Sequence, residues 1–552
     1  MTTLLPLPER VLKRVGDLRV QAARFRVGAL NAEDFRAHRV PQGLYEQRTA
    51  GSYMLRVRLP GGLVTAAQAR GLARLAADHG ARLHLTTRQD LQFHELGLEA
   101  AVAIQEGLVP LGLSALGTGG NTVRNVTADP LAGVAADEAF DVRPHALAVT
   151  GLLLDRDGTD RLPRKFKVVF SGSDADRAGA AVADLGFIAR NRAGEPGFLV
   201  LVGGGLGGRP ALALTLTDWI PAADSLLYAE AICALFAARG DRANKATARL
   251  RHLRWRLGEA PFLELCREAV TAQRRSGPAG PVPALVAVHA PPARPASALP
   301  AAFHAIDGVV PERDAGRVSL RFAPILGDLA PAALVALADA AQDFASPLLR
   351  AGLDQELWLT GVAGGDVPDL LERLAAHQVG APGAGNLRIP ACAGAATCKL
   401  GLLRSRGAAS AIAAQLAGAA VPLLDLRISG CPNSCGRHLV AGLGFEGKVR
   451  RVNGRLLPCY EVFVGGRHGA AGASLGRRLG AVPAKRLPAF VAAVAKGRLV
   501  DADAIQPLVA EHAALPVTVP EDWFTDWDDQ RPFSLAGLGQ GECAVDAPPA
   551  AP

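Results

Sequence analysis

The chain has 552 residues, of which 49% are hydrophobic, and a formal net charge of +8. This length predicts several domains. The chain has no block of five or six like charges, no zinc-finger spacing and no basic tract interleaved with aromatics, which argues against nucleic-acid binding. Anionic small molecules and an acidic protein partner suit the basic charge better.

The N-terminal sequence MTTLLPLPERVLKRVGDLRV is interrupted by charges too early for the apolar region of a signal peptide. The chain also has no run of about 18 apolar residues, so we expect no membrane-spanning helix and no membrane partner. Both features predict a cytoplasmic protein.

The first half of the chain predicts a strand, a helix and a return strand, at residues 53–59, 61–80 and 83–96. Thr65 is the expected N-cap of the helix and Gly80 its expected C-cap. The same order returns at residues 317–325, 327–345 and 353–362. There, GDL at Gly327 matches GGL at Gly61. The sequence therefore predicts a small α/β unit that occurs twice.

A longer pattern also occurs twice, each time after the small unit. The first copy contains RKFKVVFSGSDAD, FLVLVGGGLGG and WIPAADSLLYAEAICALF, and the second contains LLDLRISGCPNSCG, YEVFVGGRHGAAG and AVPAKRLPAFVAAVAK. The preserved order predicts a larger α/β unit in each half. The glycine-rich stretch Val202–Gly208 lacks the G-x-G-x-x-G spacing of dinucleotide sites, so close packing around a flat cofactor is the better interpretation.

Cationic and polar side chains gather on single faces of the predicted strands, since alternate residues of a strand share a face. They are Arg56, Arg58, His84, Thr86, Arg88, Gln92, His94, Lys165 and Lys167. Arg124 adds a cation between Asn121 and Asn125. Taken singly, each fits a solvated sheet face. Together they suit a polycarboxylate cofactor and a small oxyanion, because rigid elements hold the charges in place.

Four cysteines form two pairs with unusual spacing. Cys392 and Cys398 make C-x5-C, and Cys431 and Cys435 make C-x3-C within SGCPNSCGR. Zinc sites prefer C-x2-C pairs, whereas four thiolates complete an iron–sulfur cluster. Proline and glycine in the second pair predict a tight turn with backbone N–H groups near the cluster sulfurs. The other cysteines, interpreted as ordinary thiols, are Cys233, Cys266, Cys459 and Cys543.

From Gly43 to Trp527 the chain resembles the sirohaem-containing sulfite and nitrite reductases. The matching phrases are GLYEQR, MLRVRLPGG, TTRQDLQFH, NTVRNV, PLAG, LPRKFK, LVGGGLG, the C-x5-C pair and SGCPNSCGR. The resemblance implies a 4Fe–4S cluster coupled to sirohaem. It also implies an α+β fold with pseudo-twofold repeats, in which two ferredoxin-like half-domains pair and two larger α/β units flank them.

The predicted limits follow this architecture. They are an N-terminal extension at 1–45, half-domains at 46–110 and 310–378, α/β units at 111–309 and 379–530, and a disordered tail at 531–552.

The resemblance also implies roles for individual residues. The cluster ligands are Cys392, Cys398, Cys431 and Cys435, and Cys435 also bridges to the sirohaem iron. The cations around the substrate are Arg56, Arg124, Lys165 and Lys167. The residues near the sirohaem or the cluster are Arg88, Gln92, His94, Asn121 and Asn433. His84 is a departure, since some members have arginine there.

The substrate is either sulfite or nitrite, each reduced by six electrons. Many ferredoxin-dependent nitrite reductases resemble LPRK-aromatic-Asn, whereas this chain has Lys167 at the last position, which favours the sulfite dianion. A precorrin-3B synthase type is a further alternative, disfavoured by the complete cationic set. No flavin or NADPH domain is apparent, so reduced ferredoxin or a separate flavoprotein supplies the electrons. A Tyr–Cys crosslink seen in relatives is not expected, because Tyr45 has no cysteine at 119–127.

Overall fold

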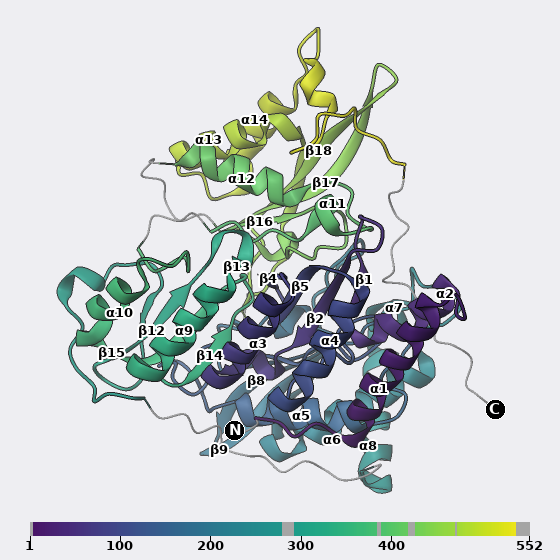
Figure 1. Ribbon diagram of the computed structural model, residues 1–552, viewed down its shortest axis with the longest axis vertical. Helices are drawn as coiled ribbons and strands as arrows, with labels where there is room; N and C mark the ends of the chain where they lie inside the picture. Colours follow the sequence, from purple (N-terminus) through teal and green to yellow (C-terminus); the bar gives the residue numbers. More distant parts are fainter. Residues whose placement is uncertain (1–3, 279–291, 384–387, 418–424, 470–471, 537–552) are drawn as a thin grey trace.

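The computed structural model describes residues 4–278, 292–383, 388–417, 425–469 and 472–536. Cys543 and most of the predicted tail lie outside these residues. Two of the three five-stranded sheets within them stand side by side (Figure 1). The first has the order β1 (Leu44–Glu46), β2 (Tyr53–Arg58), β5 (Asp90–Leu96), β4 (Arg82–Leu85) and β13 (Asp328–Leu329). The second has the order β11 (Val309–Pro311), β12 (Arg317–Phe322), β15 (Leu357–Ala363), β14 (Leu348–Ala351) and β3 (Leu63–Thr65).

The two halves exchange a short strand. β13 of the second half pairs with β4 of the first, and β3 of the first half pairs with β14 of the second. Each exchanged strand follows a 3₁₀ turn, η2 (Pro60–Gly62) or η7 (Ile325–Gly327). The predicted match of Gly61 with Gly327 is therefore wrong by one residue, and Gly62 is the counterpart of Gly327. A Cβ at Gly62 would lie 2.6 Å from Ala351 O, and one at Gly327 would lie 2.8 Å from Leu85 O.

A glutamine in each half repeats the same contacts. Gln89 donates to Ala351 O at 2.8 Å and accepts from Ala128 N at 2.9 Å. Gln355 donates to Leu85 O at 3.3 Å and accepts from Ala391 N at 2.8 Å. Both have left-handed backbones, with φ of 57° and 64°. The predicted α+β class with paired, pseudo-twofold halves is confirmed.

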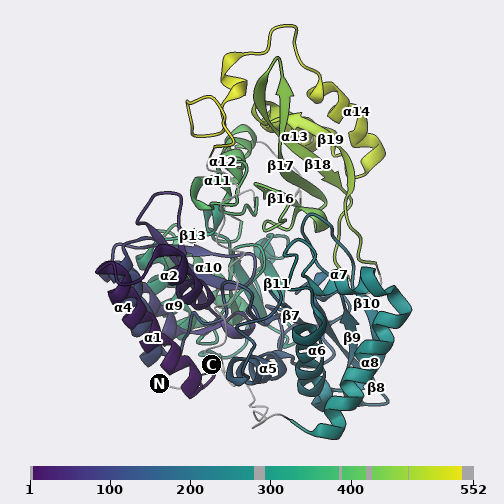
Figure 2. The same cartoon turned by 90° about the vertical axis from the view of Figure 1, so that its right-hand side faces the viewer.

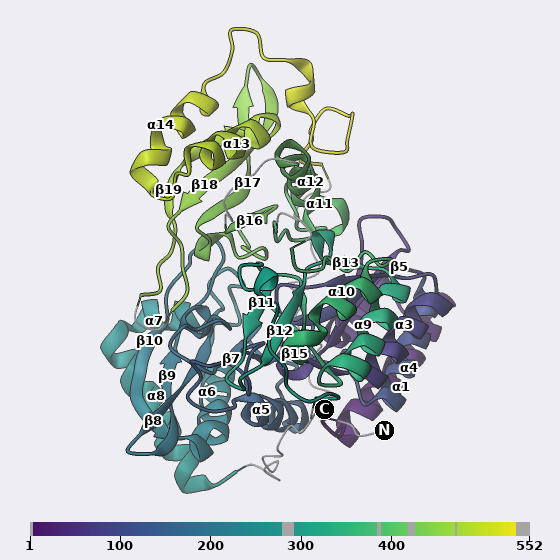
Figure 3. The ribbon, with the colours of Figure 1, turned by 90° about the vertical axis from the view of Figure 1, so that its left-hand side faces the viewer.

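Helices cover one side of the joined sheets, where Figure 3 shows several of them packed side by side. They are α1 (Glu9–Arg26), α2 (Ala32–Arg39), α3 (Ala66–Asp78), α4 (Leu98–Leu108), α9 (Pro331–Phe344) and α10 (Val367–Leu374). Thr65 caps α3 in a capping box with Gln68, as predicted. The C-cap is His79, and Gly80 follows it with φ of 60°. One hydrophobic core runs through both halves.

Each half also has a larger α/β unit, and Figure 2 shows the second unit above the first. The first contains β6 (Thr127–Ala128), β7 (Val168–Ser171), β8 (Leu185–Arg192), β9 (Glu195–Val202), β10 (Leu214–Pro221), α5 (Arg143–Asp155), α6 (Ser225–Arg239), α7 (Leu250–Leu257) and α8 (Glu259–Ser276). The second contains β16 (Leu426–Ser429), β17 (Leu443–Val452), β18 (Arg455–Val464), β19 (Arg477–Pro483), α11 (Gly394–Thr397), α12 (Ser405–Leu416), α13 (Leu487–Gly497) and α14 (Ala502–Ala513).

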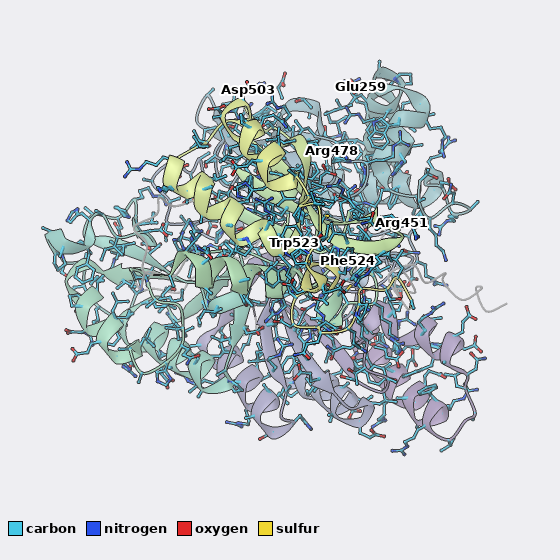
Figure 4. The ribbon with its side chains drawn as sticks, turned by 90° about the horizontal axis from the view of Figure 1, so that it is seen from above. Glu259, Arg451, Arg478, Asp503, Trp523 and Phe524 are labelled. Carbon is cyan, nitrogen blue, oxygen red and sulfur yellow. The ribbon has the colours of Figure 1, made fainter. Side chains whose placement is uncertain are left out.

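The two larger units share a topology. In each, a short strand runs parallel to the first arm of a hairpin, β7 beside β8 and β16 beside β17. Viewed from above, the second unit, with Asp503 on α14 and Arg478 on β19, lies over the others, and Glu259 marks α8 of the first unit (Figure 4). The remaining 3₁₀ turns are η1 (Val40–Gln42), η3 (Val109–Leu111), η4 (Ala180–Val182), η5 (Ala222–Asp224), η6 (Ala301–Phe303), η8 (Gly364–Asp366), η9 (His438–Val440), η10 (Ala484–Arg486) and η11 (Glu521–Phe524).

Two predicted strands are corrected. Residues 83–96 form a hairpin of β4 and β5, because the Thr86 hydroxyl accepts from the N–H groups of Arg88 and Asp90 and closes a tight turn. Lys165 and Lys167 were predicted to lie on a strand, but β7 begins only at Val168, so both residues lie just before it.

None of the helices in the described ranges is long and apolar enough to cross a membrane. The domain limits stay predictions.

Asp328 ties the exchanged strand β13 to other parts of the chain. Its carboxylate accepts from Arg82 at 2.8 Å, from His84 at 3.0 Å and from Arg406 of α12. Burial acts to raise the pKa of Asp328, but the hydrogen bond with His84 and the charge of Arg406 outweigh it and bring the pKa to about 2. The ionised carboxylate therefore stabilises the exchange of strands.

Asp328→Asn is expected to lower the free energy of unfolding by about 2 kcal/mol at neutral pH. Because the folded-state pKa is depressed, this contribution is complete above the unfolded-state value of about 4 and is lost as pH falls through about 2. Urea unfolding across this pH range will show the gap between variant and wild type closing. Asp339→Asn, which breaks a half-exposed pair with Arg70, is the control and should cost less than about 1 kcal/mol. Equal losses would contradict the prediction.

Candidate functional site

A cavity of about 350 Å³ lies where the half-domains meet the two α/β units. β2, β5, the residues before β7 and the cysteine loops contribute to its walls. The predicted site residues that line it are Arg56, Arg88, Gln92, His94, Arg124, Lys165, Lys167, Cys392, Cys398, Cys431, Asn433 and Cys435. The tertiary fold thus gathers residues that are hundreds of positions apart in the sequence.

Asn121 is the predicted site residue that does not line this cavity. Its side-chain oxygen accepts from Nη1 of Arg164 at 3.4 Å, and its backbone carbonyl accepts from the N–H of Leu162. Arg164 does line the cavity. Asn121 therefore supports a cation of the wall from behind.

Cys392 is held by groups of its own α/β unit. Gly430 N–H donates to Sγ of Cys392 at 3.2 Å, and the Ser405 hydroxyl lies 3.4 Å from the same sulfur. Burial and the neighbouring cysteines raise the pKa of both Cys392 and Cys431. These thiols stay protonated at neutral pH without a metal, so iron binding must displace their protons.

The second cysteine pair lies in a tight turn after β16, as its glycine and proline residues predict. Gly436 N–H donates to the Ser429 hydroxyl at 3.0 Å, and a Cβ at Gly436 would lie 2.0 Å from Ile428 O. Only glycine fits this approach. The Thr87 hydroxyl donates to the carbonyl of Cys435 at 2.6 Å, which fixes the turn against the first half-domain.

Side chains of the first sheet orient one another on the opposite wall. With its amide oxygen toward Arg56, Gln92 accepts from Nη2 and Nε of that arginine at 2.8 and 3.0 Å. The same amide then donates to Nε2 of His94 at 3.1 Å. Gln47 lies 3.2 Å from Nδ1 of His94, and burial holds the pKa of His94 well below its usual value. His94 is therefore a neutral ring in a fixed orientation.

Three arginines of the cavity wall have a buried Nε without a hydrogen-bond partner in the described part of the chain. They are Arg88, Arg124 and Arg437. Nη2 of Arg88 donates to Asn125 O at 2.9 Å, and Nη2 of Arg124 donates to Gly120 O at 2.9 Å. Burial lowers the pKa of Arg88 to about 10, so it stays charged at neutral pH. Orphaned donors in a cavity wall indicate an anionic ligand, because unpaired buried donors are costly.

Lys167 is placed by a buried ion pair behind it. Its backbone N–H donates to Asp184 at 3.0 Å, and Asp184 accepts from Nη2 of Arg249 at 2.8 Å. Burial, together with the charges of Arg88, Arg249 and Lys165, holds the pKa of Lys167 well below its usual value. An anion in the cavity opposes this effect, because a nearby negative charge favours the charged form of Lys167.

Sequence reasoning missed several charged residues of the wall, among them Asp90 and Arg437. Asp90 is 4% exposed and lies opposite Arg58 in the β2–β5 pair, and burial raises its pKa against the charges of the surrounding arginines. Its position two residues before Gln92 could have revealed it, since both share a strand face. Arg437, the last residue of SGCPNSCGR, is buried, and its Nη2 lies 2.8 Å from Nε2 of His468. Nothing in the local sequence indicates that contact.

The fold and this site suit an oxidoreductase that holds an iron–sulfur cluster beside an anionic cofactor. The nitrite and sulphite reductase 4Fe-4S domain matches residues 119–274, and the nitrite/sulfite reductase ferredoxin-like half domain matches residues 45–111 and 310–377. The chain belongs to the nitrite and sulfite reductase family. The four paired cysteines lie outside the matched residues.

Curated relatives include both kinds of reductase. A ferredoxin–nitrite reductase of Synechococcus elongatus is 30% identical over 76% of this chain and 81% of the relative. A ferredoxin-type sulfite reductase of Mycolicibacterium paratuberculosis is 28% identical over 82% of this chain and 83% of the relative. The solved structure of the Mycobacterium tuberculosis NirA protein has a TM-score of 0.73 and 26% identity, and the match covers 89% of this chain and 93% of that chain.

The residues present fit the sirohaem and 4Fe–4S cluster that this family carries. Four thiols face one cavity, and cluster thiolates each bind a different iron, so they stand further apart than the ligands of one ion. In the described ranges no three His, Cys, Asp or Glu side chains gather around a single metal-ion position. The unpartnered guanidinium atoms of Arg88, Arg124 and Arg437 suit the carboxylates of sirohaem. When bound, the two groups supply an iron for the oxyanion and the electrons that reduce it.

Proposed function

We propose that this enzyme reduces sulfite to sulfide with six electrons, and that reduced ferredoxin supplies them. Arg56, Arg124, Lys165 and Lys167 bind the oxyanion, Arg88, Gln92, His94, Asn433 and Cys435 contact the cofactors, and the four paired cysteines hold the cluster. Asn121 is proposed to act from behind the wall.

The position of Lys167 in the cavity wall is the observation that favours sulfite over nitrite. Lys167 lies in the cavity wall with Lys165. Many nitrite reductases that this chain resembles have an asparagine at the corresponding position. Sulfite is a dianion at alkaline pH and nitrite a monoanion, so an additional cation favours sulfite. The buried position strengthens that preference, because screening by water is weak there.

The same side chains can supply protons as each oxygen of the substrate leaves as water. Lys167 has a lowered pKa, which makes its ammonium a better acid than that of an exposed lysine. Arg56 is oriented by Gln92 and stays a fixed positive charge beside the departing oxygen. The chain thus divides proton delivery and charge stabilisation between two kinds of residue.

Ferredoxin is supported as the donor by relatives that carry it in their names, of both the nitrite and the sulfite type. The net charge of +8 suits a small acidic protein. The separate flavoprotein that the sequence left open has no support from these relatives. Nitrite is the second candidate substrate, favoured by the 30% identity to the Synechococcus elongatus enzyme.

Steady-state kinetics on the loaded enzyme test this proposal. With reduced methyl viologen as donor, kcat/KM for sulfite is expected to exceed that for nitrite by about tenfold, equivalent to one additional charge contact. The reverse order would make the enzyme a nitrite reductase. Visible absorption of sirohaem in the purified protein is the control, and its absence after faithful loading would remove the reductase assignment itself.

A further inference from the structure

The segment that carries Cys398 is anchored from the first half-domain. Between β1 and β2 the chain turns outward, and Arg48 of this turn makes three hydrogen bonds to residues 397–401. Its backbone N–H donates to Thr397 O at 3.2 Å, its Nε donates to Cys398 O at 3.2 Å, and its Nη2 donates to Gly401 O at 2.7 Å. Arg48 and Cys398 are 350 positions apart in the sequence.

These hydrogen bonds reach carbonyl groups at and just beyond the C-terminal end of a short helix. The short helix α11 ends at Thr397, with Cys398 as its C-cap. The last carbonyls of a helix have no partner within the helix, and an arginine that donates to the carbonyls beyond such an end stabilises it by its hydrogen bonds and its charge. Arg48 therefore fixes the backbone on both sides of the cysteine.

A second contact strengthens the same anchor. Nζ of Lys399 lies 2.6 Å from Oε2 of Glu46, two residues before Arg48. Glu46 also accepts from Gly51 N–H at 3.4 Å, which closes the turn on itself. The first half-domain thus holds residues 397–401 through one fork of hydrogen bonds and one ion pair. Cys392, in contrast, is held within its own unit by Gly430.

The charge of Arg48 also acts on the cysteine itself. The half-buried guanidinium of Arg48 donates to the carbonyl of Cys398 at 3.2 Å, so its positive charge lies close to the cysteine. The interaction is therefore electrostatic as well as structural. Reduction of a cluster adds one negative charge to it, and a fixed cation at a ligating residue stabilises the reduced form.

We propose that Arg48 is a positioning residue for the iron–sulfur cluster, which fixes the Cys398 loop and raises the reduction potential of the cluster. It acts through Cys398 and its loop and has no role in substrate binding. The inference rests on the cluster within the proposed function and is independent of the choice between sulfite and nitrite. The arginine that ends GLYEQR thus acts on the cluster through the Cys398 loop.

The test compares two changes at one position in the loaded enzyme. Arg48→Gln removes the charge and the fork, and Arg48→Lys keeps the charge but loses the fork. The control is Arg317→Gln, since Arg317 likewise donates to two backbone carbonyls, Gly361 O at 2.8 Å and Arg294 O at 2.9 Å, away from the cavity. Redox titration monitored by electron paramagnetic resonance, without substrate, gives the midpoint potential, and iron content after exposure to air gives cluster retention.

Arg48→Gln is expected to shift the midpoint potential to more negative values and to lose iron faster than wild type. Arg48→Lys should keep a potential near wild type yet lose iron faster, which separates charge from anchoring. If Arg48→Gln cannot be loaded while Arg317→Gln can, the anchoring role is supported and Arg48→Lys tests the charge. A wild-type potential and wild-type iron retention in Arg48→Gln would overturn the proposal, whatever the substrate preference.

Discussion

Cys435→Ser is expected to lower turnover of both sulfite and nitrite at least about a hundredfold. Cys435 lines the cavity with the other three cysteines and is the most exposed of them. A serine hydroxyl has nearly the same size, but soft thiolates are the ligands that iron–sulfur clusters select. The measurement is turnover with reduced methyl viologen, with iron and acid-labile sulfide counted per chain.

Cys459→Ser is the matched control for this change. Cys459 is fully buried in β18 of the same α/β unit, and its Sγ contacts Leu457 O at 3.6 Å, away from the cavity. We expect Cys459→Ser to retain the cluster and most of the turnover, with a modest loss of stability. If the two variants kept the same iron content and the same activity, Cys435 would be neither a ligand nor a bridge.

Lys167→Asn is expected to reduce kcat/KM for sulfite by about tenfold to a hundredfold, the range of one charge-assisted contact, and to reduce it less for nitrite. Asparagine keeps a polar side chain but removes the charge that the dianion needs. It leaves the backbone N–H that donates to Asp184, so the wall should keep its shape. Parallel kinetics with the two substrates over a range of pH measure the effect.

The pH dependence adds a second readout for Lys167. Its pKa is held below the usual value, so the protonated fraction declines at a lower pH than for an exposed lysine, and sulfite turnover should fall with it on the alkaline side. Lys167→Asn should remove that alkaline limb. Lys448→Asn, a lysine paired with Glu446 outside the cavity, should leave both substrates unaffected. Equal losses for sulfite and nitrite in Lys167→Asn would remove the reason to prefer sulfite.

Local sequence patterns predicted many of the residues that line the cavity. A strand face is a property of neighbouring residues, so alternation alone placed Gln92 and His94 on one face. The pairing of β2 with β5 then brought Arg56 opposite Gln92. Asn121 shows the limit of this reasoning, because proximity to Arg124 in sequence did not place it in the cavity. The same alternation places Asp90 on the face of Gln92, but an acidic residue among several arginines was not expected.

The sequence by itself determined the duplicated order of elements, the cysteine pairs and the cations, because spacing and periodicity are local and survive in a single chain. Only the tertiary structure decided that β3 and β13 change places, that residues 83–96 turn back at Thr86, and that Arg48 reaches Cys398. Each depends on partners far away in sequence, chosen by the packing of whole sheets. No local pattern encodes such a partner, so the contacts that tune the cluster became visible only in the folded chain.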